Sequence, residues 1–543
     1  MRKNKITQVI LLGAGLAFGA ASLSVSAAQV PEGTKLAKEQ TLVRDNGTEV
    51  ASIDPQKTEG VPESNVIRDM FEGLVIQDGE GNIIPGVAES WETQDNKTFT
   101  FHLRKDAKWS NGDPVTAEDF VFAWQRAVDP ATASPYATYL KMATMKNAGA
   151  IIDGKADKST LGVKAIDAQT LQVELDASVP YFVQMAAHTT MMPVNKKVVE
   201  KWGDEWTKAE HMVSNGAFKL EKWVINERMV LVRNTEYWDN KDTVLDKVVY
   251  LPIENQVSAM NRFLAGEVDM TYEIPNQQYK SLKKQYPETI KNPGYLCTYY
   301  YGFNTAKKPF DDVRVREALS YAIDRDVITR ILLGQGQKPA YALTPDVTAG
   351  FTAALPDYAK LTQKERIEKA KELLNAAGFD KGHPLSFNLL YNTSENHKKL
   401  AVAIASMWKK SLGVNVTIEN QEWKTYLDNR REGNYDVMRA GWCGDYNEAS
   451  TFLSIMRSDN SSNDMNYDSK AYDAAIDNAL NSTDDKKRAS YYQEAESLLA
   501  KDMPLAPIYQ YVAVRQVNPL VGGYPKANAQ DNIYSKDLYK IAK

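Results

Sequence analysis

The sequence contains few residues of the kinds that build metal centres and disulfide frameworks. Among its 543 residues are two cysteines and five histidines, and none of them are arranged with the spacing of a metal site. After the N-terminal segment, no apolar run approaches the roughly 18–20 residues that a transmembrane helix requires. We therefore expect no metal, no cofactor and no membrane span in the folded chain.

The motifs of several catalytic classes are also absent. The sequence has no G-x-S-x-G, no P-loop and no G-x-G-x-x-G. The stretch "DGEGN" (78–82) resembles the start of a calcium loop but lacks its later glycine and glutamate, so we interpret it as a hairpin turn. The sequence does not exclude a catalytic pair of carboxylates, because it does not show which of the 70 acidic residues meet in the folded protein. These absences favour a binding protein over an enzyme.

The charge pattern excludes another group of partners. The net charge is −5 and there are no blocks of Lys and Arg, so the chain lacks the basic surface that nucleic acids or anionic membranes require. Apolar residues make up 43% and charged residues 25%, which are ordinary values for a globular protein and exclude wholesale disorder.

The N-terminus has the pattern of a secretory signal peptide. "MRKNK" is followed by the short apolar run "VILLGAGLAFGAASL", and Val25-Ser26-Ala27 forms a small-residue cleavage site. We expect residues 1–27 to be removed; a membrane anchor is the alternative. In an exported chain Cys297 and Cys443 most simply form one disulfide, and two buried free thiols are the alternative.

Strand-like and helix-like patterns alternate along the rest of the chain. Residues 98–104 alternate apolar and polar side chains, as in a half-buried strand. Residues 115–128 have helical spacing, and Thr116 with Asp119 resembles a capping pair. The same reasoning predicts helices at 311–332, 363–378 and 397–413, and strands at 384–392 and 414–420. This order predicts an α/β architecture with partly parallel sheets.

Several longer stretches resemble one known family. "KWSNGDPVTAEDFVFAWQRAVDP" (108–130) matches the signature W-[ST]-[DN]-G-x-P-[VL]-[TS]-A-x-D-[FV] of the large periplasmic peptide-binding proteins that serve ABC importers. "RDMFEGLV", "GFNTAKKPFDDVRVREALSYAIDRD" and "RAGWCGDYNEAST" resemble the same family, and the similarity extends from about residue 30 to the C-terminus. "LLYNTSENHKKLA", "NQEWKTYLD" and both cysteines are most similar to its oligopeptide-binding members.

This resemblance implies an α/β periplasmic-binding-protein clamshell, in which two lobes close on a ligand about a hinge. It is built from three discontinuous domains. By resemblance, domain I comprises residues 28–71, 196–296 and 513–543, domain II residues 72–195, and domain III residues 297–512. The disulfide would then lie within domain III and stiffen one wall of the cleft without locking the hinge.

The resemblance also implies the function and the partners. Such a protein binds short peptides of about two to five residues with little sequence selectivity, using strand-like pairing to the ligand backbone. It delivers them to an ABC permease complex of the inner membrane. We expect a periplasmic monomer without enzymatic activity and without a nucleic-acid partner.

The site residues follow from the same resemblance. The charged ends of a buried peptide need partners, and the resemblance assigns the peptide N-terminus to Asp445. It assigns the backbone to Gly441, Cys443, Glu59 and Val61, the C-terminus to Arg439, His397 and Arg430, and side-chain pockets to Tyr136, Tyr272, Tyr300, Trp423, Trp442 and Tyr511. Each assignment has an alternative. Arg439 is then a structural arginine, His397 a core or capping residue, and the aromatic residues part of the core.

Other ligands, and one other class of function, are alternatives to this interpretation. A binder of murein tripeptide shares "TPDVTAGFT", "FNTAKK" and "APIYQY" but not the cysteine pair. A dipeptide or haem binder is a further alternative. A secreted peptidase would need a nucleophile, metal or acid pair that no motif indicates.

Overall fold

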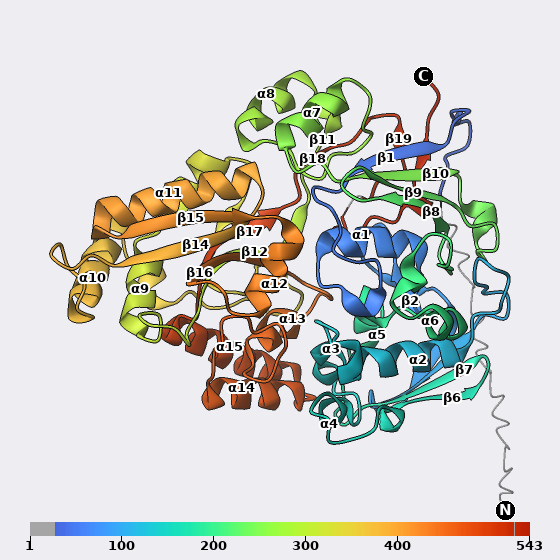
Figure 1. Ribbon diagram of the computed structural model, residues 1–543, viewed down its shortest axis with the longest axis horizontal. Helices are drawn as coiled ribbons and strands as arrows, with labels where there is room; N and C mark the ends of the chain where they lie inside the picture. Colours follow the sequence, from blue (N-terminus) through green and yellow to red (C-terminus); the bar gives the residue numbers. More distant parts are fainter. Residues whose placement is uncertain (1–27, 526) are drawn as a thin grey trace, which may run out of the picture.

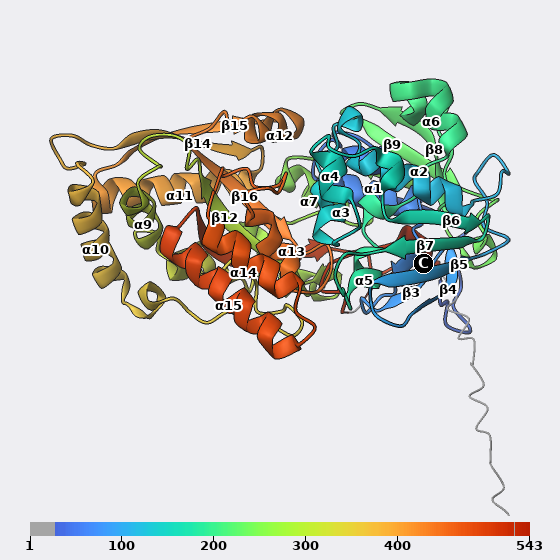
Figure 2. The same cartoon turned by 90° about the horizontal axis from the view of Figure 1, so that it is seen from below.

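The computed structural model describes residues 28–525 and 527–543, so the predicted signal peptide lies outside the described residues. Two lobes lie side by side in both views of the molecule (Figure 1 and Figure 2). Within the described chain no helix is long and apolar enough to cross a bilayer. The α/β class predicted from the alternating patterns is confirmed.

The first lobe, on the right in Figure 1, contains two four-stranded sheets. One has the order β1-β10-β9-β8, in which β1 and β10 are parallel and the other pairs antiparallel. The other is antiparallel, with the order β4-β5-β7-β6. The strands are β1 (Thr41–Asp45), β4 (Ala88–Thr93), β5 (Thr98–Leu103), β6 (Val163–Asp167), β7 (Thr170–Glu174), β8 (Phe218–Val224), β9 (Arg228–Arg233) and β10 (Lys247–Leu251).

The second lobe is built on a six-stranded mixed sheet of order β13-β17-β12-β16-β14-β15. The chain enters it along β12 and leaves along β17, and these strands pair at Gly294 and Val512. The two crossings between the lobes therefore run side by side. The strands are β12 (Gly294–Phe303), β13 (Lys338–Pro339), β14 (Ser386–Asn392), β15 (Asn415–Gln421), β16 (Val437–Cys443) and β17 (Leu505–Val512).

Three short two-stranded sheets contain the remaining strands of the described residues. The pair β2 and β3 is the antiparallel hairpin predicted around residues 78–82. The strands are β2 (Val75–Gln77), β3 (Ile83–Pro85), β11 (Ile290–Lys291), β18 (Arg515–Gln516), β19 (Val521–Gly522) and β20 (Tyr539–Lys540).

Helices cover both lobes (Figure 1). Up to residue 290 they are α1 (Val61–Met70), α2 (Ala117–Val128), α3 (Thr138–Met142), α4 (Ala148–Ile152), α5 (Phe182–Met185), α6 (Lys196–Trp202), α7 (Gln256–Leu264) and α8 (Tyr279–Gln285). The later helices are α9 (Val313–Tyr321), α10 (Gln363–Ala376), α11 (Glu395–Leu412), α12 (Trp423–Arg431), α13 (Ser450–Leu453), α14 (Lys470–Leu480) and α15 (Asp485–Asp502).

The local patterns predicted most of these elements correctly. Thr116 and Asp119 form a capping box at the start of α2. Helix α11 ends at Gly413, which has φ +75° and so adopts a conformation that glycine tolerates at low cost. Strands β14 and β15 flank α11 and are parallel, as the βαβ order predicted.

The prediction of one helix over residues 311–332 is wrong. Helix α9 ends at Tyr321, and a separate helical segment covers Val327–Leu333. The fully buried Arg325 lies in the break, and its guanidinium donates to the carbonyl oxygens of Ser320 and Pro507. The buried cation satisfies carbonyl groups at the end of α9, because such groups lack helical partners.

The predicted domain boundaries stay a proposal. Each sheet draws its strands from one predicted domain, apart from the first residues of β12. The apolar cores follow the lobes: one large cluster fills the first lobe, and two clusters lie on opposite faces of the six-stranded sheet in the second.

Candidate functional site

A cavity of about 220 Å³ lies between the two lobes. Its walls come from segments far apart in the sequence, including the start of α1, the end of β16 and the N-terminal end of α11. Of the predicted site residues, the structure brings these to the cavity: Glu59, Val61, Tyr136, Tyr272, His397, Trp423, Arg430, Arg439, Gly441, Trp442, Cys443, Asp445 and Tyr511.

Tyr300 is the exception, and its assignment to a ligand pocket is corrected. Its side chain is 4% exposed and belongs to the apolar cluster on one face of the six-stranded sheet. Its neighbours Tyr299 and Tyr301 belong to the cluster on the other face. Because side chains alternate along a strand, Tyr300 is a core residue and does not line the cavity.

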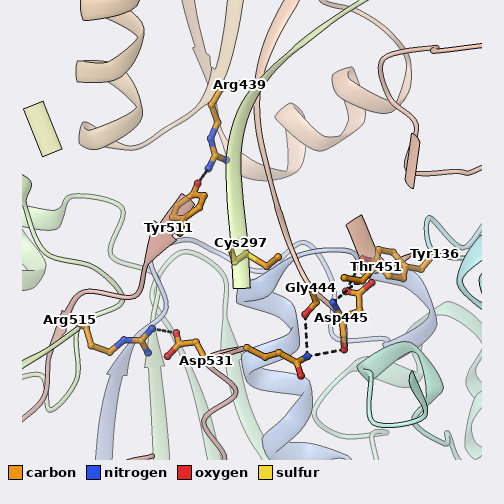
Figure 3. The surroundings of a disulfide bond; sticks show 11 residues. Tyr136, Cys297, Arg439, Gly444, Asp445, Thr451, Tyr511, Arg515 and Asp531 are labelled. Carbon is orange, nitrogen blue, oxygen red and sulfur yellow. Dashed lines mark hydrogen bonds and ion pairs between the residues drawn. A yellow bond between two sulfur atoms is a disulfide. The ribbon is translucent and has the colours of Figure 1, made fainter. Parts of the chain in front are cut away.

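The disulfide between Cys297 and Cys443 is present (Figure 3). The two cysteines are directly opposite each other in the antiparallel pair β12 and β16. The bond therefore holds the end of β16 to the strand on which the chain enters the second lobe. Asp445, two residues further on, is anchored by its backbone N–H, which donates to Thr451 Oγ1 at 2.9 Å.

Asp445 presents a carboxylate to the cavity, with a side chain only 8% exposed. The hydroxyl of Tyr136 lies 3.2 Å from each of its carboxylate oxygens (Figure 3). His188 Nε2 lies 3.2 Å from Oδ1. Both partners belong to the first lobe and Asp445 to the second, so these contacts cross the cleft.

The hydrogen bonds of His188 indicate which nitrogen carries its proton. The backbone N–H of Thr190 points to Nδ1 at 3.3 Å, so Nδ1 is the acceptor. Nε2 then carries the proton and donates to Asp445. Within the described chain no Lys or Arg pairs with the Asp445 carboxylate, whose partners are the Tyr136 hydroxyl and His188. A buried carboxylate without a Lys or Arg partner favours binding of a ligand cation.

Arg439 is the corresponding cation in another part of the cavity. Its Nη1 donates to Asn392 Oδ1 at 3.1 Å, its Nη2 donates to the Tyr511 hydroxyl (Figure 3), and its guanidinium lies 4.7 Å from the centroid of the Tyr299 ring. Within the described chain it forms no ion pair, and its Nε is buried without a partner. A guanidinium with free donors binds carboxylates well.

His397 is buried beside this arginine. Burial, reinforced by the charge of Arg439, lowers the pKa of His397 well below its ordinary value. Among the residues that the structure describes, none forms a hydrogen bond with its Nδ1. His397 therefore contributes a neutral imidazole rather than a second cation, and its contact with a ligand C-terminus stays a prediction.

Arg430 already has two carboxylate partners. Its Nη2 lies 3.0 Å from Glu59 Oε2, across the cleft, and its Nε lies 2.8 Å from Asp464 Oδ2. Arg431 also pairs with Glu59. Burial raises the pKa of Asp464 to about 6, against the opposing effect of Arg430. Glu59 thus uses its side chain to join the lobes, and Arg430 is less available to a ligand than Arg439.

Several cavity residues were not predicted from the sequence, among them His188, Arg68 and Glu273. His188 was one of five scattered histidines, and no pattern links it to Asp445. Arg68 opens the family-like stretch "RDMFEGLV" but was not assigned a role. Glu273 follows the predicted Tyr272 and lines the cavity without an ion pair in the described chain. Only the position of Arg68 in a quoted motif could have drawn attention to it.

The comparisons with known proteins agree with this geometry. Residues 82–464 match the model of the bacterial extracellular solute-binding proteins, family 5 middle. The periplasmic oligopeptide-binding protein OppA of Salmonella typhimurium is 53% identical over 541 residues, covering 99% of each chain. A structure of Haemophilus influenzae OppA in complex with the peptide RPPGFSPFR has a TM-score of 0.92 at 49% identity, covering 94% of this chain and 100% of that one.

Two structures of the murein tripeptide-binding protein MppA bear on the arrangement of the lobes. One structure, of the Escherichia coli protein, matches this chain with a TM-score of 0.93. The other, an unliganded open form of MppA, matches it with a TM-score of only 0.66. Both structures are 50% identical to this chain. Each match covers 94% of this chain, together with 100% of the first structure and 99% of the open form. Because sequence identity and coverage match, we attribute the difference to lobe arrangement: the lobes here are not in that open arrangement.

Proposed function

We propose, since this chain belongs to the bacterial extracellular solute-binding proteins of family 5, that it binds short peptides between its lobes and presents them to an ABC permease in the inner membrane. The relatives named oligopeptide-binding proteins are periplasmic and about half identical over nearly the whole chain, which supports the same compartment and ligand class. A solute-binding role accounts for the cavity without any chemical step.

One observation carries the proposal: the carboxylate of Asp445 faces the cavity, its partners are Tyr136 and His188, and no Lys or Arg of the described chain pairs with it. A peptide ammonium supplies the missing positive charge and further donors. Arg439, with no ion pair of its own in the described chain, is suited to the ligand carboxylate. These two charges match what all free peptides share, whatever their side chains.

The edge of β16 supports binding of the peptide backbone. Along its whole length β16 pairs with β12, but β14 pairs with it only at Val437 and Met438. From Arg439 to Cys443 no strand of the described chain covers that edge, and Gly441 and Cys443 line the cavity. An extended peptide can add to such an edge through main-chain hydrogen bonds, which are insensitive to ligand side chains.

Murein tripeptide is the second candidate ligand. It is supported by the MppA relative of Escherichia coli, which is 50% identical over 521 residues. Both candidates carry a free ammonium and a carboxylate, so Asp445 and Arg439 do not distinguish them. Mass spectrometry of ligands that co-purify with the protein separates the two: mixed peptides support the first, and a single diaminopimelate-containing species supports the second.

The test of the proposal is thermal unfolding in the presence of tripeptides. A ligand that binds only the folded state raises the melting temperature, so Ala-Ala-Ala is expected to do so and to be recovered uncleaved. N-acetyl-Ala-Ala-Ala lacks the ammonium and is expected to give no shift. Equal shifts for both peptides contradict the role of Asp445, and cleavage of the peptide contradicts a purely binding role.

A further inference from the structure

A second set of contacts joins the two lobes outside the ligand cavity. This set, called the outer contact below, links α3 and the turn before it in the first lobe to a loop before α14 in the second. Its residues are Pro135, Thr138 and Lys141 in the first lobe, and Asp459, Asn460 and Ser461 in the second. None of these six residues lines the ligand cavity, so the outer contact forms without any atom of the ligand.

Thr138 is the buried centre of the outer contact. Its hydroxyl oxygen lies 3.0 Å from Asn460 Oδ1 and 2.7 Å from Ser461 Oγ, and it accepts the backbone N–H of Ser461 at 3.2 Å. Thr138 and Asn460 are only 5% and 8% exposed. The Ser461 hydroxyl also donates to the carbonyl oxygen of Pro135 at 2.8 Å. Loss of the Thr138 hydroxyl would leave buried polar groups without this partner, which destabilises the closed lobes.

Lys141 and Asp459 form the exposed part of the outer contact. Lys141 Nζ lies 2.6 Å from Asp459 Oδ2, and the two side chains are 30% and 40% exposed. Both line a second cavity, of about 390 Å³, where α3 and α4 of the first lobe face α14 of the second (Figure 1). Solvent that enters this cavity screens the ion pair, so its contribution to closure is small. Thr138 is therefore expected to contribute more than Lys141.

Each side of the outer contact is held in shape by its own lobe. In the second lobe, Asn460 Nδ2 donates to the carbonyl oxygen of Ser454 at 2.9 Å, and Arg457 Nε donates to Asp459 Oδ1 at 2.9 Å. In the first lobe, Tyr139 of α3 belongs to the apolar core. Because these interactions lie within one lobe, both surfaces are ordered before the lobes meet. Little conformational entropy is then lost when the outer contact forms.

The outer contact is continuous with the contact that faces the ligand. Tyr136, which bonds to Asp445 in the ligand cavity, lies between Pro135 and Thr138 of the outer contact. One short segment of the first lobe therefore carries both contacts, and they form together when the lobes close. A contact that stabilises the closed lobes without touching the ligand contributes equally to the binding of every ligand that requires closure.

We infer that the outer contact is a latch that stabilises the closed lobes and raises the affinity for every peptide by the same factor, with Thr138 as its main residue. The affinity for a ligand that requires the closed lobes depends on the fraction of the protein that adopts them. The latch increases this fraction. A protein that binds many peptides thereby gains affinity without contacts to their side chains. This inference rests on the proposed function and adds the source of a sequence-independent part of the affinity.

The experiment measures affinities by isothermal titration calorimetry for Ala-Ala-Ala, Ala-Phe-Ala and Ala-Glu-Ala. The variant Thr138→Val keeps the shape of the side chain and removes its hydroxyl. We expect it to bind all three peptides about tenfold more weakly than wild type, because the partners of Thr138 are buried in the closed lobes and face water in the open ones. The ratios of affinity between the peptides are expected to stay within about twofold of the wild-type ratios.

A buried threonine within one lobe provides the matched control. Thr348 is also 5% exposed, and its hydroxyl donates to the carbonyl oxygen of Pro345 at 2.8 Å within the second lobe. Thr348→Val is expected to lower the melting temperature and to leave all three affinities nearly unchanged, because its hydrogen bond does not depend on closure.

The exposed ion pair is tested by Lys141→Met. This variant is expected to weaken all three peptides about twofold at low salt, and the difference from wild type is expected to disappear at high salt. Its control is Lys146→Met, because Lys146 Nζ lies 2.7 Å from Glu174 Oε2 within the first lobe. The control variant is expected to bind each peptide like wild type at both salt concentrations.

Each outcome decides the inference separately from the proposed function. If wild-type protein binds the peptides and Thr138→Val binds them equally well, the inference is wrong and the proposed function stands. The same holds if Thr138→Val changes the ratios between peptides, or if Thr348→Val weakens binding as much. If Thr138→Val does not fold, Lys141→Met decides: a uniform loss that high salt abolishes supports the latch, and unchanged affinity contradicts it. If wild-type protein binds no tripeptide, the proposed function fails and the inference fails with it.

Discussion

Tyr136 and Asp445 connect the two lobes at the site where a ligand ammonium is proposed to bind. The Tyr136 hydroxyl lies 3.2 Å from both carboxylate oxygens of Asp445. Tyr136 precedes α3 in the first lobe, and Asp445 follows β16 in the second. The same carboxylate therefore faces the ligand and joins the lobes, so ligand binding and closure share one group.

The first prediction concerns the charge of Asp445. Asp445→Asn is expected to weaken the binding of Ala-Ala-Ala by about 3–5 kcal/mol, because a buried ammonium loses its counter-charge. Calorimetric titration measures the change. Wild-type protein and the variant are expected to bind N-acetyl-Ala-Ala-Ala equally weakly. A variant that keeps wild-type affinity for the free peptide shows that the ammonium binds elsewhere.

The second prediction concerns the contact across the cleft. Tyr136→Phe removes a hydrogen bond to a charged group, which contributes about 1.5–3 kcal/mol. Because the contact forms only when the lobes are closed, we expect the loss to appear mainly as faster peptide dissociation in stopped-flow experiments.

A matched control for Tyr136 is available in the same helix region. The Tyr139 hydroxyl donates to the carbonyl oxygen of Met185 at 3.0 Å, within the first lobe. Tyr139→Phe is expected to lower the melting temperature and to leave the dissociation rate nearly unchanged. Equal effects of the two variants on dissociation are inconsistent with a role of Tyr136 in closure.

The third prediction concerns the disulfide. The two cysteines are 146 residues apart, and the chain-entropy model assigns such a crosslink on the order of 4–5 kcal/mol of stability. The double variant Cys297→Ser/Cys443→Ser is expected to unfold at markedly lower urea concentration, with tripeptide affinity within a few-fold of wild type. Reduction of the wild-type protein is the control. A large loss of affinity with little loss of stability argues that the bond mainly positions the ligand.

The fourth prediction concerns the pH dependence of stability through Glu63. This residue of α1 is buried and accepts hydrogen bonds from the Ala51 backbone N–H at 2.7 Å and from Trp423 Nε1 at 3.1 Å. Burial raises its pKa from 4.5 to about 7. Between these pH values the folded state binds more protons than the unfolded state, so the contribution of Glu63 to stability is full below pH 4.5 and is lost as the pH rises through 7.

Glu63→Gln imitates the protonated residue and removes this dependence. Relative to wild type, the variant is expected to gain about 2–3 kcal/mol of unfolding free energy between pH 5 and pH 8. Urea unfolding at several pH values measures the difference. A difference between the two proteins that does not change with pH is incompatible with titration of Glu63 in this range.

Local patterns were sufficient where neighbouring residues decide the structure. The capping box of α2, the glycine that ends α11 and the parallel strands β14 and β15 all followed from short sequence windows. The helix predicted over 311–332 was wrong because Arg325 bonds to Pro507, which is distant in sequence. Tyr300 was misassigned because its neighbours alone do not show which face of β12 meets the cavity.

The sequence by itself determined the predicted export signal, the α/β class, the family-like motifs and the two cysteines that pair. Only the tertiary structure decided which charged residues of the cavity are paired. Glu59 and Arg430 are 371 positions apart yet form an ion pair, whereas Arg439 and Glu273 have none in the described chain. The physical reason is that the state of a buried charge depends on partners brought together by the whole path of the chain.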